Sequence, residues 1–157
     1  MRLKVGFFSF TCCEGCVVTF LELLNKKFFE YEKRIDIVNC RVLKTNEKIG
    51  NLDVAFIEGA ISTPSEEKKL KEIRKKSRFV VALGSGAVNG YPSNQRNSFT
   101  EEKKQEISLL VKSLHQLKEI VPLKKFIKVD DEITECPVSE VDLEKRIDYY
   151  LKKFKIR

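Results

Sequence analysis

The sequence lacks what several common classes of protein require. It contains a single histidine, and no apolar run approaches the roughly 20 residues that a membrane-spanning helix needs. The first residues lead directly into a strand-like segment, without the apolar core of a signal peptide or a twin-arginine leader. Internal repeats and linker-like composition are also missing. We therefore expect a cytoplasmic chain without a membrane span, folded as a single domain over residues 1–157.

The excess of one sign of charge is modest. Lys and Arg number 30 against 23 Asp and Glu, which gives a net charge of +7. Many of the lysines alternate with glutamates, as in residues 66–72, and neither aromatic residues nor base-reading motifs accompany them. We interpret the excess as a solvated surface and expect no nucleic-acid partner. A basic rim that meets an acidic redox partner is the alternative.

What the sequence does contain is a regular alternation of strand and helix patterns. Continuous apolar, β-prone segments predict five strands, at residues 3–10, 35–40, 53–57, 79–83 and 126–129. Apolar periodicity and capping signals predict helices at residues 17–32, from Thr63 onward, at 101–117 and at 139–154. Strands that are apolar on both faces and alternate with helices predict an α/β fold, a flavodoxin-like doubly wound parallel five-stranded sheet.

The predicted topology brings distant loops to one edge of the sheet. In such folds, ligands collect at the carboxyl ends of the strands. Residues 12–16 follow the first strand, a glycine loop at residues 84–90 follows the fourth, and Cys136 follows the fifth. Cysteines more than a hundred residues apart in the sequence can therefore meet at this edge. Cys40 lies inside the second predicted strand, so we expect it in the core.

Three cysteine chemistries fit a Cys-x-x-Cys pair at a strand-to-helix turn. Cys13 and Cys16 could form a dithiol redox pair, because a helix N-terminus lowers the pKa of a thiol. They could also be half of a zinc site or half of an iron–sulfur site. A dithiol pair has no use for Cys136, zinc usually takes two close pairs, and the single His115 lies far away in a predicted helix. Dispersed thiolates with a Cys-Pro step favour the iron–sulfur site.

Several segments resemble one family in the same order along the chain. Residues 11–16, Thr-Cys-Cys-Glu-Gly-Cys, resemble the Thr-x-Cys-x-Gly-Cys opening of cytoplasmic nickel–iron hydrogenase small subunits, especially the sulfhydrogenase delta type. Similar matches follow at residues 53–63, 81–87, 94–97 and 135–138. The resemblance covers nearly the whole chain. The same fold is shared with the 20-kilodalton cluster-bearing subunit of NADH:quinone oxidoreductase.

The resemblance implies an electron-transfer subunit of a hydrogenase complex, an oxidoreductase component without catalytic residues of its own. It implies one proximal iron–sulfur cluster of the 4Fe-4S type, next to a nickel–iron site held by the large subunit. Cys13, Cys16 and Cys136 match three of the family's cluster ligands. The expected partners are that large subunit and either a reductase or diaphorase subunit or a small electron carrier.

One position departs from the family's pattern. The family's remaining cysteine lies in a Gly-x-Cys-Ala segment, where this sequence has Gly86, which cannot bind a metal. Cys12 is the favoured substitute, because it resembles the tandem cysteines of the 20-kilodalton subunit. The alternatives are an oxygen ligand from Ser85, Glu14 or a partner, a 3Fe-4S cluster, or no cluster in a scaffold subunit. A dithiol or flavin redox protein is the last alternative, although the glycine loop lacks the full Gly-x-Gly-x-x-Gly pattern.

Overall fold

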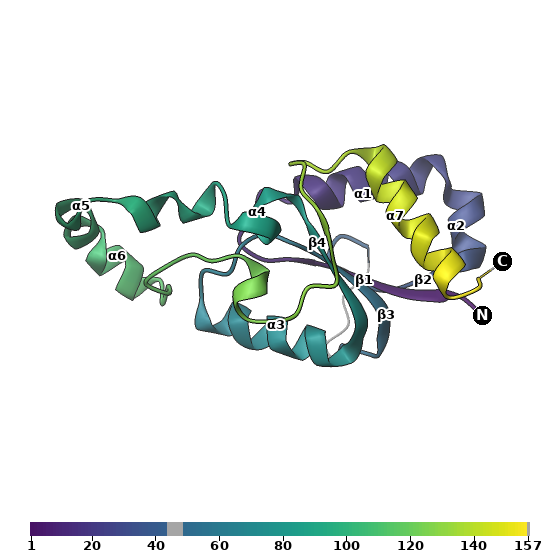
Figure 1. Ribbon diagram of the computed structural model, residues 1–157, viewed down its shortest axis with the longest axis horizontal. Coiled ribbons are helices and arrows are strands. Elements are labelled where there is room, and N and C mark those ends of the chain that lie inside the picture. The colour runs from purple at the N-terminus through teal and green to yellow at the C-terminus, as the bar shows by residue number, and fades with distance from the viewer. Residues whose placement is uncertain (44–48, 157) are drawn as a thin grey trace.

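The computed structural model describes residues 1–43 and 49–156 and places a parallel sheet between two layers of helices (Figure 1). Its strands are β1 (Leu3–Ser9), β2 (Ile35–Cys40), β3 (Leu52–Glu58), β4 (Ser77–Leu83) and β5 (Asp131–Ile133). Their order is β2-β1-β3-β4-β5, and all neighbouring strands are parallel. This is the flavodoxin-like order, so the predicted fold class is confirmed.

Helices cover both faces of the sheet. Figure 1 shows α1 (Gly15–Lys26), α2 (Phe28–Arg34) and α7 (Glu140–Lys153) on one face and α3 (Pro64–Lys76) on the other. The short α4 (Gly84–Asn89) starts directly at the end of β4. The remaining helices are α5 (Glu101–Glu106), α6 (Ser108–Ser113) and two 3₁₀ turns, η1 (Ser93–Ser98) and η2 (Leu123–Lys125).

Each face of the sheet has its own core. Below α1 and α7, Phe7 stacks between Phe20 and Phe56, with ring centroids 3.7 and 4.8 Å apart. The opposite face packs against Leu70 and Ile73 of α3, which are both fully buried. Strands that are covered on both faces explain why their sequences are apolar without alternation.

The start of α3 follows its sequence signal closely. Thr63 accepts a hydrogen bond from the Glu66 N–H, and the Glu66 carboxylate accepts one from the Thr63 N–H, with Pro64 at the first helical position. This reciprocal capping box satisfies two N–H groups that the first turn leaves without helical partners. The predicted helix start is confirmed.

The helix predicted over residues 17–32 is in fact two helices. The backbone leaves the helical conformation at Lys27, with φ −114° and ψ 25°, between α1 and α2. Because of this break, Tyr31 turns into the core and is 1% exposed, whereas Phe28 is 48% exposed. A single apolar helix over residues 17–32 would bury Phe28 on the same face as Phe20 and Leu24. This does not happen, since the apolar period of α1 does not continue through the break.

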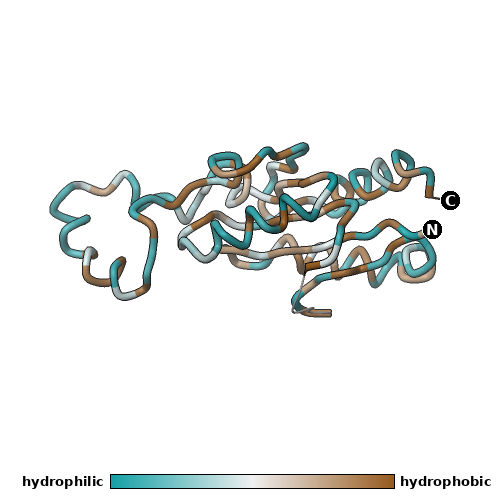
Figure 2. The backbone as a smooth tube through the Cα atoms, turned by 90° about the horizontal axis from the view of Figure 1, so that it is seen from below, coloured by the Kyte–Doolittle hydropathy of each residue, from teal (hydrophilic) through white to brown (hydrophobic). Residues whose placement is uncertain are grey.

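The helix predicted over residues 101–117 is also broken. It forms α5 and α6, six residues each, and neither contains a buried residue. Residues 93–119, which we call the arm, project beyond the sheet edge (Figure 1), and Figure 2 shows the arm as a separate, mostly hydrophilic loop. Leu110 and Leu114 are 63% and 61% exposed. An apolar period predicts a buried face only where a core lies against it, and here none does.

The fifth strand lies a few residues later than predicted. The apolar residues Phe126, Ile127 and Val129 pack against the α3-side core, and β5 begins at Asp131. Asp130 sets this register, because its N–H donates to the Val80 carbonyl and its carboxylate accepts from the Val80 N–H at 2.9 Å. A polar residue that replaces a strand partner at the sheet edge cannot be identified from hydropathy alone.

Asp130→Asn is expected to destabilise the fold by about 1–3 kcal/mol at neutral pH, because the carboxylate also accepts from the Arg74 guanidinium. Burial raises the pKa of the Asp130 carboxyl, but the bonds from Val80 and Arg74 outweigh it, so the net pKa lies below its ordinary value. The stabilisation is therefore present above pH about 4 and is lost as the pH falls through the lowered native pKa. Urea unfolding between pH 7 and pH 3 measures both effects.

The matched control for this prediction is Glu132→Gln, which changes an exposed carboxylate two residues further on, within β5. It should shift stability by no more than about 0.5 kcal/mol. An Asp130→Asn variant with unchanged stability and unchanged acid dependence would contradict the role given to this carboxylate.

Candidate functional site

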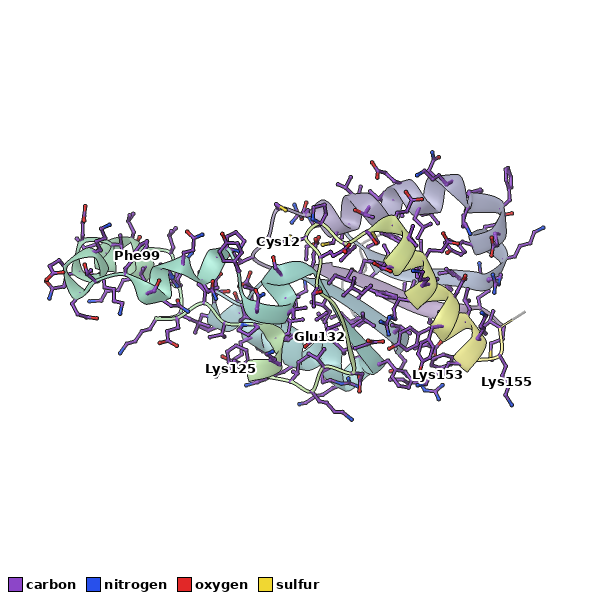
Figure 3. The ribbon with its side chains drawn as sticks, turned by 45° about the horizontal axis from the view of Figure 1, so that its top comes forward. Cys12, Phe99, Lys125, Glu132, Lys153 and Lys155 are labelled. Atoms are coloured by element: carbon purple, nitrogen blue, oxygen red, sulfur yellow. The ribbon has the colours of Figure 1, made fainter. Side chains whose placement is uncertain are left out.

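Four cysteines line one open cavity at the carboxyl edge of the sheet. The cavity has a volume of about 260 Å³ and contains the side chains of Cys12, Cys13, Cys16 and Cys136 in its wall. Its other lining residues come from the ends of the neighbouring strands, from α4 and from the segment after α4: Thr11, Glu58, Gly59, Leu83, Gly84, Gly86, Tyr91, Pro92 and Ser93. Cys12 lies at this edge in Figure 3. The fifth cysteine, Cys40, is fully buried in the core, as predicted.

Gly84 brings two of the sulfur atoms to the same point. A Cβ placed on this glycine would lie 2.9 Å from the Cys16 Sγ and 3.6 Å from the Cys136 Sγ. Its φ of +76° also belongs to the left-handed region that side chains other than glycine rarely adopt. The prediction of a glycine loop at residues 84–90 was wrong, since Gly84–Asn89 form α4. The first residue of this helix lies tightly against the sulfurs of Cys16 and Cys136, which are 120 residues apart in the sequence.

The two cysteine loops also contact each other at Gly15. A Cβ placed there would lie 3.4 Å both from the Cys13 Sγ and from the Pro137 Cβ. Cys13 and Cys136 are exposed, whereas Cys16 is buried at the start of α1. The site is thus open to solvent on one side and closed by the protein on the other.

Cys12 and Gly86 both lie close to Gly59 in the cavity wall. A Cβ placed on Gly59 would lie 3.0 Å from the Cys12 Cβ, and one placed on Gly86 would lie 3.2 Å from the Gly59 Cα. Glycine at position 86 therefore allows α4 to approach the end of β3 closely. Cys12 therefore lies near position 86, where the family's pattern has its remaining cysteine.

Glu58 holds the start of α1 in place. This carboxylate is only 2% exposed, and it accepts hydrogen bonds from the Cys16 N–H at 3.1 Å and the Ser9 hydroxyl at 2.8 Å. The residue before the helix, Glu14, has a left-handed φ of 62° and no capping side-chain bond; it pairs instead with Arg41 at 3.3 Å. A carboxylate at a helix N-terminus satisfies a free N–H and meets the positive end of the helix dipole.

The environment of Cys16 is unfavourable for a reactive thiol. Burial raises the pKa of the Cys16 thiol to about 12, although the backbone N–H of Val138 acts in the opposite direction. A dithiol redox pair instead requires a nucleophilic thiol with a lowered pKa. The dithiol alternative therefore finds no support at Cys16, whereas binding to a metal removes the proton from such a thiol.

Convergence of the ligands on one point distinguishes a single-ion site from a cluster site. Among residues 1–43 and 49–156, no three His, Cys, Asp or Glu side chains converge closely enough to hold one metal ion. Zinc would need such convergence, because its thiolates bind at about 2.3 Å from one centre. In an iron–sulfur cluster, cysteine thiolates bind the separate irons and surround the cluster instead. His115 is exposed on the arm and takes no part in the site.

The fold and the site together define the class, a doubly wound α/β protein in which thiols from both ends of the sequence surround one cavity. The family described as NADH ubiquinone oxidoreductase, 20 Kd subunit, matches residues 13–150, and the chain belongs to this family. No helix in the part of the chain that the structure describes is long and apolar enough to cross a membrane.

Three curated relatives are components of hydrogenases. A vhu component of the F420-non-reducing hydrogenase of Methanocaldococcus jannaschii is 31% identical over 87% of this chain and 52% of its own length. The gamma component of the coenzyme F420 hydrogenase of Methanosarcina barkeri is 30% identical over 88% and 50%. The delta component of sulfhydrogenase 2 of Pyrococcus furiosus is 26% identical over 98% and 67%. This chain thus spans about half to two thirds of their length.

Solved structures share the fold. A chain of an NAD⁺-reducing [NiFe]-hydrogenase in the H2-reduced state superposes with a TM-score of 0.85 at 20% identity, covering 98% of this chain and 93% of that one. A [NiFeSe]-hydrogenase chain from Dm. baculatum gives a TM-score of 0.62 at 16% identity, covering 99% and 66%. The resemblance that the cysteine motifs indicated is therefore confirmed at the level of family and fold.

Proposed function

We propose that this chain is the electron-transfer small subunit of a nickel–iron hydrogenase and holds an iron–sulfur cluster, of the 4Fe-4S type, within a single domain. Cys12, Cys13, Cys16 and Cys136 would be its ligands. The observation that carries the proposal is the cavity in which these four thiols meet at the carboxyl edge of the sheet. Cys₄ is the usual ligand set of a four-iron cluster. The names of the curated relatives support the hydrogenase assignment.

The chain's own residues would hold the cluster and tune it. A bound cluster supplies one-electron oxidation and reduction. The N–H groups of Glu14 and Val138 face the sulfurs of Cys12 and Cys16, where they stabilise negative charge on thiolates. The buried side chain of Leu83 in the cavity wall excludes water from one side of the site. Proton and hydrogen chemistry would belong to the partner.

The open side of the cavity is where we place the large subunit with its nickel–iron site. Cys12, Cys13 and Cys136 are exposed there, and Tyr91 on the same rim is 54% exposed. A partner that covers this rim would exclude water from the thiols and shorten the path for an electron. A reductase or diaphorase subunit, or a small electron carrier, would exchange electrons with the complex.

Iron and acid-labile sulfide, measured on protein purified without oxygen, test the proposal. We expect about four of each per chain, and an electron paramagnetic resonance signal that appears on reduction with dithionite. About three irons with a signal in the oxidised state would mean that the change at Gly86 leaves an incomplete cluster. A chain without iron would overturn the electron-transfer assignment.

A cluster-free scaffold subunit is the second candidate, and Gly86 is the observation that favours it. This position has no side chain, and its backbone lies close to Gly59 without room for a Cβ at ordinary contact distance. The scaffold candidate predicts tight binding to a large subunit and no iron in the chain. The iron measurement separates the two candidates directly.

A further inference from the structure

Glu66 is linked by hydrogen bonds to the loop that carries the cysteines. Its Oε2 accepts from the Ser62 N–H at 2.8 Å, the Ser62 hydroxyl at 3.0 Å and the Thr63 N–H at 3.1 Å. Its Oε1 accepts from the hydroxyl of Thr11 at 3.0 Å. The hydroxyls of Thr11 and Ser62 lie 2.6 Å apart. One carboxylate thus connects the start of α3, the segment after β3 and the residue that precedes Cys12.

The directions of these hydrogen bonds require the Glu66 side chain to act as the acceptor. The N–H groups of Ser62 and Thr63 can only donate, and a hydroxyl has one proton to give. If Thr11 donates to Glu66, the Ser62 hydroxyl donates either to Thr11 or to Glu66. An ionised carboxylate accepts all of these bonds, and bonds to a charged acceptor are stronger than neutral ones.

Thr11 is fixed in turn against the segment that follows β3. Its N–H donates to the Ala60 carbonyl at 3.1 Å, and its carbonyl accepts from the Ala60 N–H at 3.0 Å. Thr11 itself lines the cavity, next to Cys12 in the sequence. A displacement of Thr11 would therefore move the cysteine loop relative to Gly59 and Gly84.

We infer that Glu66 is a positioning residue for the cysteine loop, acting through the hydroxyl of Thr11. The inference rests on the proposed function for what that loop holds. It goes beyond helix capping, because a capping box needs only the bonds between Glu66 and Thr63. The bond to Thr11, 55 residues away in the sequence, adds nothing to the cap. The neighbouring Glu67 lacks this connection and pairs with Lys71 along α3.

Substitutions separate positioning from capping. Glu66→Ala removes both roles, whereas Thr11→Val removes only the hydroxyl of the cysteine loop. Thr63→Ala weakens the cap and leaves the bond between Glu66 and Thr11 intact. Glu66→Gln is the conservative variant, since its amide oxygen can accept from Ser62 and Thr63 while its NH₂ donates to the Thr11 oxygen. Glu67→Ala is the matched control on the same helical turn.

The first readout is the rate at which the anaerobic, iron-loaded full chain bleaches in excess chelator. We expect Glu66→Ala and Thr11→Val to bleach about tenfold faster than the unsubstituted chain, as is typical when a partner of metal ligands is lost. Glu66→Gln should return most of the way to the original rate. Thr63→Ala should lower the melting temperature without changing the bleaching rate, and Glu67→Ala should change neither.

The second readout needs no cluster. In the metal-free chain, Glu66→Ala and Thr11→Val should speed hydrogen exchange at the amides of Thr11 and Ala60, whereas Thr63→Ala should affect only the start of α3. Unchanged exchange at these two amides, unchanged bleaching, or the same changes in Thr63→Ala would each overturn the inference. If the unsubstituted chain contains no iron, the proposed function fails, and the exchange measurement alone decides the role of Glu66.

Discussion

Cys136→Ala is expected to lose nearly all of its iron while the chain stays folded. Cys136 is exposed, so its removal should change the free energy of unfolding by no more than about 0.5 kcal/mol. It is nevertheless the one proposed ligand from the C-terminal part of the chain, and its sulfur comes to the same glycine as the Cys16 sulfur. Without it, the cavity keeps thiols only from the loop after β1. Iron per chain and the dithionite-reduced resonance signal measure the loss.

Cys40→Ala is the matched control, because it removes a thiol that lies outside the cavity. Cys40 is fully buried in the core, so the variant should lose stability through a small cavity but keep its iron. We therefore expect Cys40→Ala to lose stability but no iron, and Cys136→Ala to lose iron but little stability. Opposite effects of the two variants would distinguish a role in the site from a role in the fold. If Cys136→Ala keeps its full iron content, the cluster is not held where we propose.

Most of the fold could be predicted from the sequence, because its signals are local. The capping box at Thr63 and Glu66 sets the start of α3 within one turn of helix, and Leu70 and Ile73 mark its buried side. The apolar strands likewise follow from their own residues, and the alternation of strands with helices then restricts the sheet order to a few topologies.

The errors arose where tertiary contacts decide. Phe126, Ile127 and Val129 had the composition of a strand, but the bonds between Asp130 and Val80 place the edge pairing later. Ile107 and Leu110 had the period of a buried helix, but α5 and α6 contain no buried residue. In both cases the local apolar pattern is present, but the tertiary contacts that would make it a strand or a buried helix are not.

The candidate site divides in the same way. Its cysteines could be gathered from the sequence, because parallel topology brings the ends of β1 and β5 to one edge. The two carboxylates that bond to the cysteine loop could not be predicted from the sequence. Glu58 bonds to Cys16 and Glu66 bonds to Thr11 across 42 and 55 residues of sequence, and no motif links either pair. Glu66 carried a sequence signal, but that signal pointed only to its role as a helix cap.

The second large effect concerns Cys12, the ligand that we propose in place of the cysteine absent at position 86. Cys12→Ala is expected to reduce the iron content from about four to about three per chain or to abolish it, because the remaining thiols are too few for a four-iron cluster. Adding Gly86→Cys to this variant should restore about four irons, since position 86 lines the same cavity and, like Cys12, lies close to Gly59. Iron, acid-labile sulfide and the resonance signal of the reduced state are measured for each variant.

The restoration has a steric cost that a further pair of variants measures. A Cβ at position 86 lies 3.2 Å from the Gly59 Cα and 3.5 Å from the Ala60 N, so α4 must move by a few tenths of an ångström. Gly86→Ala, with and without Cys12→Ala, carries the same crowding but no thiol. It should cost about 1–3 kcal/mol of stability in either background and restore no iron.

The comparison between cysteine and alanine at position 86 therefore decides the question, because both crowd Gly59 equally and only one adds a ligand. Restoration by cysteine alone would mean that the number of thiols around the cavity, rather than which loop supplies them, determines the cluster. If Cys12→Ala keeps about four irons and an unchanged signal, Cys12 is not a ligand, and the fourth bond must come from an oxygen of this chain or of its partner. The cluster would then have three thiolate ligands and one oxygen ligand, and Cys12 would lie beside the cluster without binding it.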